Sequence, residues 1–397
     1  MPRRFRGGGR LPALHEEARL LQKQDLFEAR RDGYHTCRIP GLVVTAGDVV
    51  LVTTEARPGR GGDYDYNDIL MRRSLDGGVT FSQPNTLVDH AAYGDGPASN
   101  LVMIPDRVSG RVVAVFCHDY ARAFSMYSDD DGATFSRPSD ITAVFEEFRA
   151  EYPWQVCATG PGHGLQLRNG RMIIPVWLSD GGGTEMGKGH RGHRPSVVAL
   201  IYSDDHGETW QRGEVVCRHD DVINGVTLIN PSETAAAERD DGRVMFNIRS
   251  ESEIQRRLVV LSRDGVSGWE SAAFDQALLE PVCMASLLRY SWSEGKERGQ
   301  CLFTNPDNLE RTMETAWGPI RPPNCDRKRL TVKLSRDDGH TWPVSRVLEP
   351  GPAGYSDLAK LPDDTILCLY ECDNVAGMFD DRYLRLARFD LDWLLSG

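Results

Sequence analysis

Short apolar runs separated by polar, glycine-rich turns follow one another along this chain. Runs such as Val49–Thr54, Val197–Tyr202 and Leu330–Leu334 are rich in β-branched residues, which favours strands. Several runs are followed by one recurring pattern, S-x-D-x-G-x-T-[WF]. Good copies begin at Ser74, Ser128, Ser203 and Ser335, and a decayed copy begins at Ser262. The repeating unit is therefore a strand, a turn and a strand.

The recurring pattern is typical of a tight turn. Its aspartate can accept backbone N–H groups, its glycine can take a positive φ, and its serine and threonine close the loop. We expect the final Trp or Phe to be buried between sheets. Irregularly spaced repeats of one β unit are typical of a β-propeller, in which each blade packs on its neighbours. The pattern predicts an all-β fold.

Length and composition fit one domain with a large core. The chain has 397 residues, of which 40% are hydrophobic, and its glycines and prolines are spread without forming a linker. We predict an N-terminal extension over residues 1–25, with a helix-compatible run around 15–26, and a single domain over 26–397. The extension is basic and glycine-rich at its start and carries no apolar stretch of signal-peptide length. As given, the chain is expected to be cytoplasmic, or exported if a leader has been removed.

The charge argues against polyanionic partners. A formal net charge of -12 disfavours nucleic acid or an anionic membrane surface. No apolar run reaches membrane-spanning length. Local arginines can still reverse the field inside a cleft, so a small anionic substrate stays compatible with this composition.

The cysteine count indicates free thiols. There are nine, mostly inside strand-like runs, which favours buried, reduced side chains and a reducing compartment. Cys368 and Cys372 on a strand, and His190 and His193 in a glycine-rich loop, are weak metal signals. We expect no catalytic metal and no cofactor.

Several charged residues sit where a β scaffold usually carries chemistry. Arg38 precedes an Ile-Pro pair, and the glycine-rich loop after Arg57 holds Asp63, Asp65 and Asp68. Such a loop is equally compatible with a plain solvated surface. Arg249 closes an apolar strand and needs a partner, because an unpaired buried charge is costly.

These motifs together resemble the retaining exo-α-sialidases of the bacterial type. The resemblance rests on Arg38-Ile-Pro, on the repeated turns, which that family calls Asp boxes, and on Tyr355-Ser-Asp-Leu ahead of Leu369-Tyr-Glu371. It covers roughly residues 26–392. It implies a six-bladed β-propeller of four-stranded antiparallel blades, with the active site at the centre of one face and the Asp boxes on the opposite face.

The resemblance also implies a role for each site residue. The arginines that clamp the substrate carboxylate resemble Arg38, Arg249 and Arg327, with Arg329 as the rival for the third place. Arg57 resembles an additional arginine near the sugar's 4-position, and Glu371 resembles the carboxylate that holds Arg38.

The catalytic groups follow in the same way. Tyr355 resembles the nucleophile, Glu233 its partner base and Asp63 the acid/base, with Asp65 and Asp68 as rivals. A carboxylate nucleophile would approach the carboxylate on the anomeric carbon of sialic acid at a cost of about 1 to 4 kcal/mol, which a phenol avoids. The chemistry expected is retention through a tyrosyl-sugar intermediate, with the pKa of Asp63 raised toward the working pH.

The chain departs from the family at one sugar-binding position. Asn100, with Asp95 nearby, stands where many members have an aspartate, which leaves recognition of the N-acetyl group open. The expected partners are sialylated glycans. The alternatives are glycans bearing another ulosonic acid such as the deaminated sialic acid KDN, transfer or release of an anhydro product, and a non-catalytic glycan-binding propeller.

Overall fold

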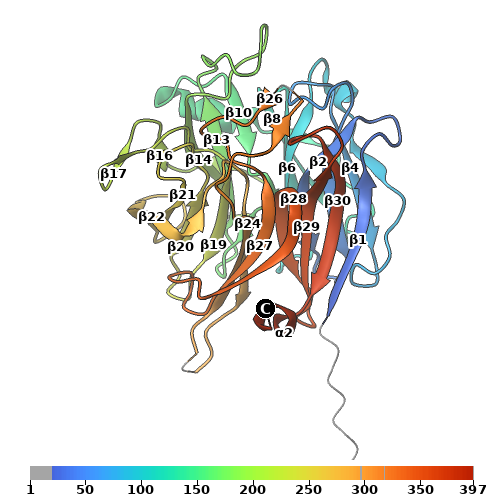
Figure 1. Ribbon diagram of the computed structural model, residues 1–397, viewed down its shortest axis with the longest axis vertical. Helices are drawn as coiled ribbons and strands as arrows, with labels where there is room; N and C mark the ends of the chain where they lie inside the picture. Colours follow the sequence, from blue (N-terminus) through green and yellow to red (C-terminus); the bar gives the residue numbers. More distant parts are fainter. Residues whose placement is uncertain (1–19, 296, 317, 397) are drawn as a thin grey trace, which may run out of the picture.

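The computed structural model describes residues 20–295, 297–316 and 318–396, and these residues form an all-β molecule (Figure 1). Antiparallel pairing dominates, and most sheets are built from strands that are consecutive in the chain. The all-β prediction is confirmed.

Four sheets occupy the first two thirds of the described chain. The first contains β2 (Thr36–Val44), β3 (Val50–Arg57), β4 (Asp68–Ser74) and β5 (Asn85–Val88). The second contains β6 (Ala98–Pro105), β7 (Val112–His118), β8 (Arg122–Ser128), β9 (Ser139–Asp140) and, parallel to β6, β11 (Gly162–His163). The third contains β10 (Val156–Thr159), β12 (Leu165–Gln166), β13 (Met172–Ser179), β14 (Ser196–Ser203), β15 (Gln211–Arg212) and β16 (Cys217–Arg218). The fourth contains β19 (Thr234–Glu238), β20 (Val244–Ile248), β21 (Arg256–Ser262) and β22 (Glu270–Leu279).

The last large sheet has seven strands. They are β23 (Ser286–Ser291), β24 (Gln300–Pro306), β27 (Lys328–Ser335), β28 (Val344–Lys360), β29 (Ile366–Asn374), β30 (Asp381–Phe389) and β1 (Leu21–Glu28). The long strand β28 joins two groups: its first part pairs with β27 and its second part with β29.

Short elements connect these sheets. The two-stranded pairs are β17 (Val222–Ile223) with β18 (Val226–Thr227), and β25 (Glu314–Thr315) with β26 (Gly318–Pro319). The helical turns are η1 (His90–Tyr93), α1 (Thr142–Glu146), η2 (Glu147–Ala150) and α2 (Leu391–Leu395). No helix within the described residues combines the length and apolar character needed to cross a membrane.

The start of the described chain is a strand. β1 pairs antiparallel with β30, and Figure 1 shows the two side by side at the edge of the last sheet. The helix-compatible run expected around residues 15–26 is therefore wrong from Leu21 onward, because pairing with β30 overrides local propensity. Its first part lies outside the described residues. The expected domain boundary at residue 25 falls inside β1.

Buried side chains fill the spaces between neighbouring sheets. Leu51 of β3 packs with Phe116 of β7, and Phe246 of β20 packs with Val198 of β14. Leu42 of β2 belongs to a cluster with residues of β29 and β30, which joins the first sheet to the last. The core is thus a series of inter-sheet layers.

The repeated turns have the expected hydrogen bonds. In the turn at Ser203, the backbone N–H of Gly207 donates to the serine hydroxyl at 2.9 Å, and the N–H of Thr209 donates to Asp205 at 2.9 Å. The same bonds recur in the turns at Ser74, Ser128 and Ser335, and the decayed copy at Ser262 closes through Asp264 and Ser267. Of the closing aromatics, the two tryptophans are buried, whereas Phe81 and Phe135 are half-buried.

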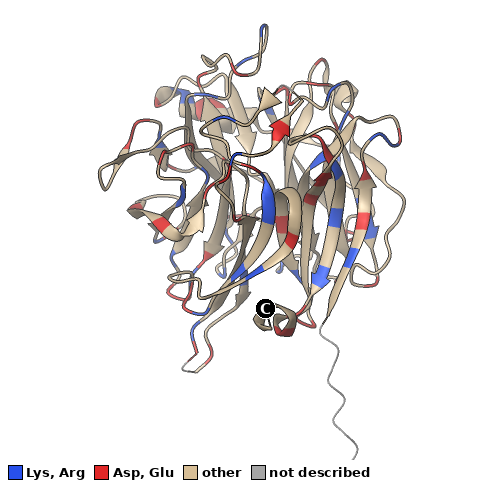
Figure 2. Cartoon of the chain, in the orientation of Figure 1, with Lys and Arg blue, Asp and Glu red and all other residues tan. Residues whose placement is uncertain are grey.

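Strand register places the turn at Ser74 at the opposite end of its sheet from Arg38. Ser74 pairs across from Val50 at the start of β3, whereas Arg38 pairs across from Glu55 near its end. Charged residues of both signs are spread over the strands and loops (Figure 2). All nine cysteines are free and buried, so the prediction of buried thiols is confirmed.

Candidate active site

A cavity of about 410 Å³ gathers almost all of the site residues expected from the sequence. Its lining includes Arg38, Arg57, Asp63, Asn100, Glu233, Arg249, Arg327 and Tyr355. Glu371 is fully buried and reaches the cavity indirectly, through its hydrogen bond to Arg38.

Breaks in strand pairing help to position these side chains. The β2–β3 ladder shifts register between Arg38 and Gly41, and the β6–β7 ladder shifts between Ser99 and Val102. At these breaks Ile39 and Asn100 take φ values of 61° and 54°, which non-glycine residues seldom adopt. A third break, between Ala353 and Ser356, flanks Tyr355 in β28. Bulges of this kind redirect side chains out of the regular alternation of a strand.

Arg38 is held by two carboxylates. Its Nη2 donates to Glu371 at 3.1 Å and its Nε to Asp381 at 3.2 Å. Burial by itself lowers the pKa of Arg38, but the charges of Glu371 and Asp381 outweigh it and keep that pKa well above its usual value. Burial, together with the neighbouring charge of Glu371, raises the pKa of Asp381 to about 7. The guanidinium is therefore a fixed positive charge at one end of the cavity.

Arg327, and not its rival Arg329, lies in the cavity. Arg327 is buried and donates to the carbonyl of Val282 at 2.8 Å, whereas Arg329 is exposed. The Arg327 guanidinium lies 4.7 Å from the Phe379 ring and 4.9 Å from the Tyr355 ring. Stacking against these rings holds the guanidinium plane in place.

Tyr355, Glu233 and Arg249 form one hydrogen-bonded group. The Tyr355 hydroxyl donates to Glu233, and Arg249 donates both to Glu233 and, at 2.7 Å, to the phenol oxygen. Burial raises the pKa of Tyr355, the Glu233 carboxylate raises it further, and Arg249 opposes them. The phenol is therefore protonated at neutral pH and already faces a base that can accept its proton.

Asp63 is paired with Arg57 at the cavity wall. Arg57 donates to Asp63 at 2.6 Å and to Glu55 at 2.6 Å, and Glu55 also accepts the backbone N–H of Asn100 at 2.7 Å. The Asp63 side chain is 34% exposed, against 2% for Arg57. Burial raises the pKa of Asp63, but the charge of Arg57 outweighs it, and the net pKa lies below its usual range. The raised pKa expected from the sequence is therefore wrong.

The two rivals of Asp63 are engaged elsewhere. Asp65 accepts the backbone N–H groups of Arg60 and Gly62, at 3.1 and 2.9 Å, within its own loop. Asp68 accepts the Tyr34 hydroxyl at 2.6 Å and contacts His90.

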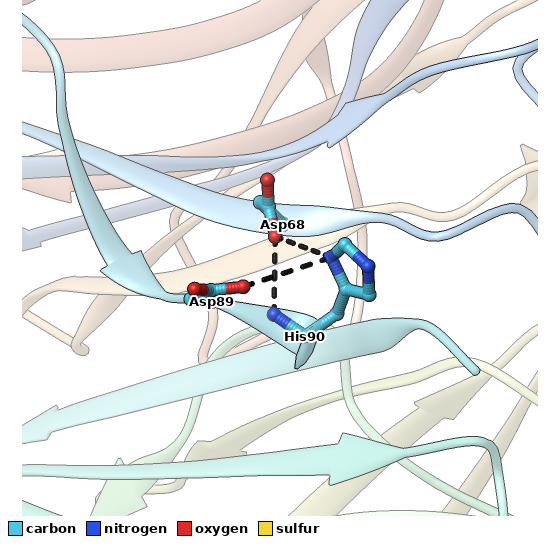
Figure 3. A group of neighbouring side chains, drawn as sticks. All are labelled: Asp68, Asp89 and His90. Atoms are coloured by element: carbon cyan, nitrogen blue, oxygen red, sulfur yellow. Dashed lines mark hydrogen bonds and ion pairs between the residues drawn. The ribbon is translucent and has the colours of Figure 1, made fainter. Parts of the chain in front are cut away.

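One carboxylate oxygen each of Asp68 and Asp89 and a ring nitrogen of His90 lie within 4.8 Å of one another, an arrangement that could hold a metal ion. Figure 3 shows the three side chains facing one another. Asp89 also caps the turn at His90 by accepting the N–H of Ala91 at 2.9 Å. Their contacts with one another and with Tyr34 account for this cluster as part of the local fold.

Sequence reasoning missed three groups in or beside the cavity. Asp381 supports Arg38 from a position 343 residues away, so no local pattern could reveal it. The sequence carries one signal for Glu55: it lies two residues before Arg57 on one strand, where alternate residues share a face. The third group is an aromatic wall of Tyr120, Trp177 and His193.

Several polar atoms in the cavity lining are buried without a hydrogen-bond partner among the described residues. They are Nδ2 of Asn100, Nε1 of Trp177, Nε2 of His193, Oδ1 of Asn230 and Nε of Arg249. Unsatisfied buried polar atoms are costly and uncommon in folded proteins. The arginines in the same lining make the cavity complementary to an anion.

Comparisons with known proteins agree with this geometry. The family model of the BNR repeat-like domain matches residues 112–368. The chain is 29% identical to a sialidase of Micromonospora viridifaciens over 94% of its own length, and 26% identical to a sialidase of Bacteroides fragilis over 86%. It spans 54% and 60% of those two relatives.

A solved structure of similar fold is that of the Hadza microbial sialidase Hz136. The TM-score is 0.72 at 24% identity, and the match covers 94% of this chain and 69% of that one. The family match extends over more than half of the chain and includes β20, which ends just before Arg249, and β28, which carries Tyr355. The chain belongs to the BNR repeat-like domain family and, within it, is similar to sialidases of the bacterial type.

Proposed function

We propose that this chain is an exo-acting, retaining glycoside hydrolase that releases terminal α-linked sialic acid from glycoconjugates. The observation that carries the proposal is the Tyr355–Glu233 hydrogen bond in a cavity lined by Arg38, Arg249 and Arg327. A module that only binds glycans has no need for a buried phenol facing a base. The similarity to sialidases supports the same activity.

The proposed architecture is a six-bladed propeller of four-stranded blades. The seven-stranded sheet supplies two blades that share β28, and the four remaining large sheets supply one blade each. The buried cluster between β2 and the β29–β30 pair supports a ring in which the first blade packs on the last.

In the proposed first step, the three arginines bind the sugar carboxylate through charge-assisted hydrogen bonds and fix the anomeric carbon beside Tyr355. A bond forms between the phenol oxygen and the anomeric carbon while the bond to the leaving oxygen breaks. Glu233 takes the phenol proton, and Asp63 gives a proton to the leaving oxygen.

In the second step, water attacks the anomeric carbon of the tyrosyl-sugar intermediate, and the bond between that carbon and the phenol oxygen breaks. Asp63, now a carboxylate, takes the water proton, and the phenol oxygen recovers its proton from Glu233. Two displacements at one carbon retain the configuration, so the first product is the α-anomer.

Binding of an anion is what prepares Asp63 for this role. Arg57 donates a hydrogen bond to Asp63 and lowers its pKa. The charge of Arg38 also lowers the pKa of Asp63, and a bound carboxylate offsets that charge. The substrate therefore raises the pKa of the group that must protonate its own leaving oxygen.

The test is hydrolysis of matched fluorogenic α-glycosides of N-acetylneuraminic acid and of KDN by the wild type and by Tyr355→Phe. We expect turnover of the N-acetyl substrate and a loss of at least about 10³-fold in kcat for the variant. Proton NMR should show the α-anomer first. A 3-fluorosialyl fluoride should add one sugar mass to the wild type and none to Tyr355→Phe.

Each other outcome has a defined meaning. A clear preference for KDN would keep the mechanism and change the substrate. Binding of both sugars without turnover would favour a glycan-binding role and contradict the proposed hydrolysis.

A further inference from the structure

The loop that carries Asp63 is fastened to a second loop across the cavity. Tyr64 follows Asp63, and its ring stacks on His190 with centroids 4.7 Å apart and planes at 19°. The same ring lies 5.1 Å from Tyr120 and 5.6 Å from His193. Its hydroxyl donates to the carbonyl of Arg191 at 3.0 Å.

The second loop, residues 180–195 between β13 and β14, is held in place by hydrogen bonds within the loop and by an ion pair to a neighbouring turn. The N–H of Gly183 donates to the carbonyl of Arg194 at 2.8 Å, and the N–H of Gly192 to that of Gly181 at 3.1 Å. Arg191 forms an ion pair with Asp119 at 2.7 Å. This loop also contributes Glu185, Met186, His193 and Arg194 to the cavity lining.

The contacts inside the Asp63 loop fix its shape more than its place over the cavity. Asp65 accepts backbone N–H groups of the same loop, and Asn67 donates to the carbonyls of Gly62 and Asp63 at 3.3 Å. Tyr64, in contrast, packs on Tyr120 in the turn between β7 and β8, on a buried cluster that includes Trp177 of the third sheet, and on the loop 180–195. Adjacent residues of one loop thus face two directions: Asp63 toward Arg57, and Tyr64 toward the aromatic wall.

We propose that Tyr64 is a positioning residue that holds Asp63 in line with the leaving oxygen by anchoring its loop to residues 180–195. The inference rests on the proposed hydrolysis. A proton donor must lie within hydrogen-bond reach of the oxygen it protonates, and a misplacement of about 1 Å can cost about 10²-fold in rate.

Such a role has a signature that a purely structural role lacks. A sugar alcohol is a poor leaving group and needs the proton from Asp63, whereas an acidic phenol leaves without help. Loss of the Tyr64 anchor should therefore slow the cleavage of sialyllactose and spare that of aryl sialosides with acidic phenols. The clamp and Tyr355 are untouched, so the attack on the anomeric carbon stays intact.

The experiment measures kcat and KM for sialyllactose and for aryl α-sialosides of graded phenol acidity. We expect Tyr64→Ala to lower kcat for sialyllactose by about 10²-fold and for the most acidic phenol by less than about threefold. Tyr64→Phe keeps the stacking and loses the bond to Arg191, so it should lie between Tyr64→Ala and the wild type. Tyr66→Ala is the matched control, because Tyr66 lies in the same loop and is 53% exposed.

A variant of Asp63, the proposed proton donor, completes the test. Asp63→Ala should show the same dependence on the leaving group, and adding Tyr64→Ala to it should cause little further loss. Equal loss on every substrate, or no loss on any, would overturn the positioning role while the hydrolysis stands. Failure of the wild type to cleave any sialoside would overturn the proposed function itself and this role with it.

Discussion

Glu371 shows how one buried carboxylate organises several parts of the cavity. Its oxygens accept the side chain of Arg38 at 3.1 Å and the backbone N–H groups of Ile39 and Tyr355 at 3.0 and 2.9 Å. Burial raises the pKa of Glu371, but Arg38, Arg327 and the two N–H groups outweigh it and leave a net lowering. Glu371 therefore contacts both Arg38, proposed to bind the substrate carboxylate, and the backbone of Tyr355, the proposed nucleophile.

The pairing of Asp63 with Arg57 predicts two different pH profiles. The profile of kcat/KM reports the free enzyme, where the pKa of Asp63 is lowered, and the profile of kcat reports the complex, where the bound carboxylate offsets part of the positive charge. Because Asp63 must be protonated to act as an acid, kcat should persist to higher pH than kcat/KM. The measurement is both profiles with sialyllactose from pH 3 to 8, a range of about five units set by the reference pKa values.

An aryl sialoside with an acidic phenol serves as the control for that measurement. Cleavage of its glycosidic bond needs no proton, so its rate should fall less steeply than that of sialyllactose as the pH rises. Coincident profiles of kcat and kcat/KM for sialyllactose would argue that the substrate does not change the protonation of Asp63.

At the scale of elements, the turns at the ends of the strands stabilise the fold through their aspartates. Asp205 accepts the N–H of Thr209 at 2.9 Å as well as the hydroxyls of Ser203 and Thr209. Burial raises the pKa of Asp205, but these hydrogen bonds outweigh it and lower the pKa overall. A lowered folded-state pKa means that the stabilisation is present above the unfolded pKa and is lost as the pH falls through the folded one.

Asp205→Ala should therefore lower the free energy of unfolding at pH 7 by about 1 kcal/mol, a figure kept small because water screens this turn. The difference from the wild type should shrink below about pH 4. Urea unfolding at several pH values measures both effects. Glu208→Ala, which removes only a surface ion pair with Arg111, is the control and should change stability by less than about 0.5 kcal/mol. A pH-independent deficit for Asp205→Ala would contradict this account.

The sequence predicts these elements well because their causes are local. Each turn closes through residues within the recurring pattern, and most of the long strands coincide with an apolar run, whereas β1 does not. Several residues that line the cavity, such as Arg38 and Tyr355, were found from sequence motifs, whereas the aromatic wall was not. The bulge at Ile39 and the contacts of Asp381 and Tyr64 were not, because each depends on residues that only the fold brings together. The lowered pKa of Asp63 is of the same kind, since it comes from a guanidinium whose direction the sequence does not specify.

At the scale of the molecule, β1 attaches the start of the described chain to its last sheet. Leu26 and Phe27 are buried in the cluster that joins β2 and β3 to β29 and β30. Phe27→Ala should lower the free energy of unfolding by about 3 to 5 kcal/mol, because it opens a cavity where the first and last sheets meet. Thermal and urea unfolding measure the change. Gln24→Ala, on the exposed part of β1, should stay within about 0.5 kcal/mol. Equal changes in the free energy of unfolding for the two variants would show that Phe27 of β1 does not stabilise the packing between the first and last sheets.

Strand β28 gives the cavity a mechanical property of its own. It is one continuous span whose two parts are stitched to different neighbours, and Tyr355 lies just past the changeover. The backbone before Tyr355 is therefore held by pairing with one strand and the backbone after it by pairing with another. A shift of the backbone that carries the phenol therefore has to disturb the pairing of β28 with both β27 and β29.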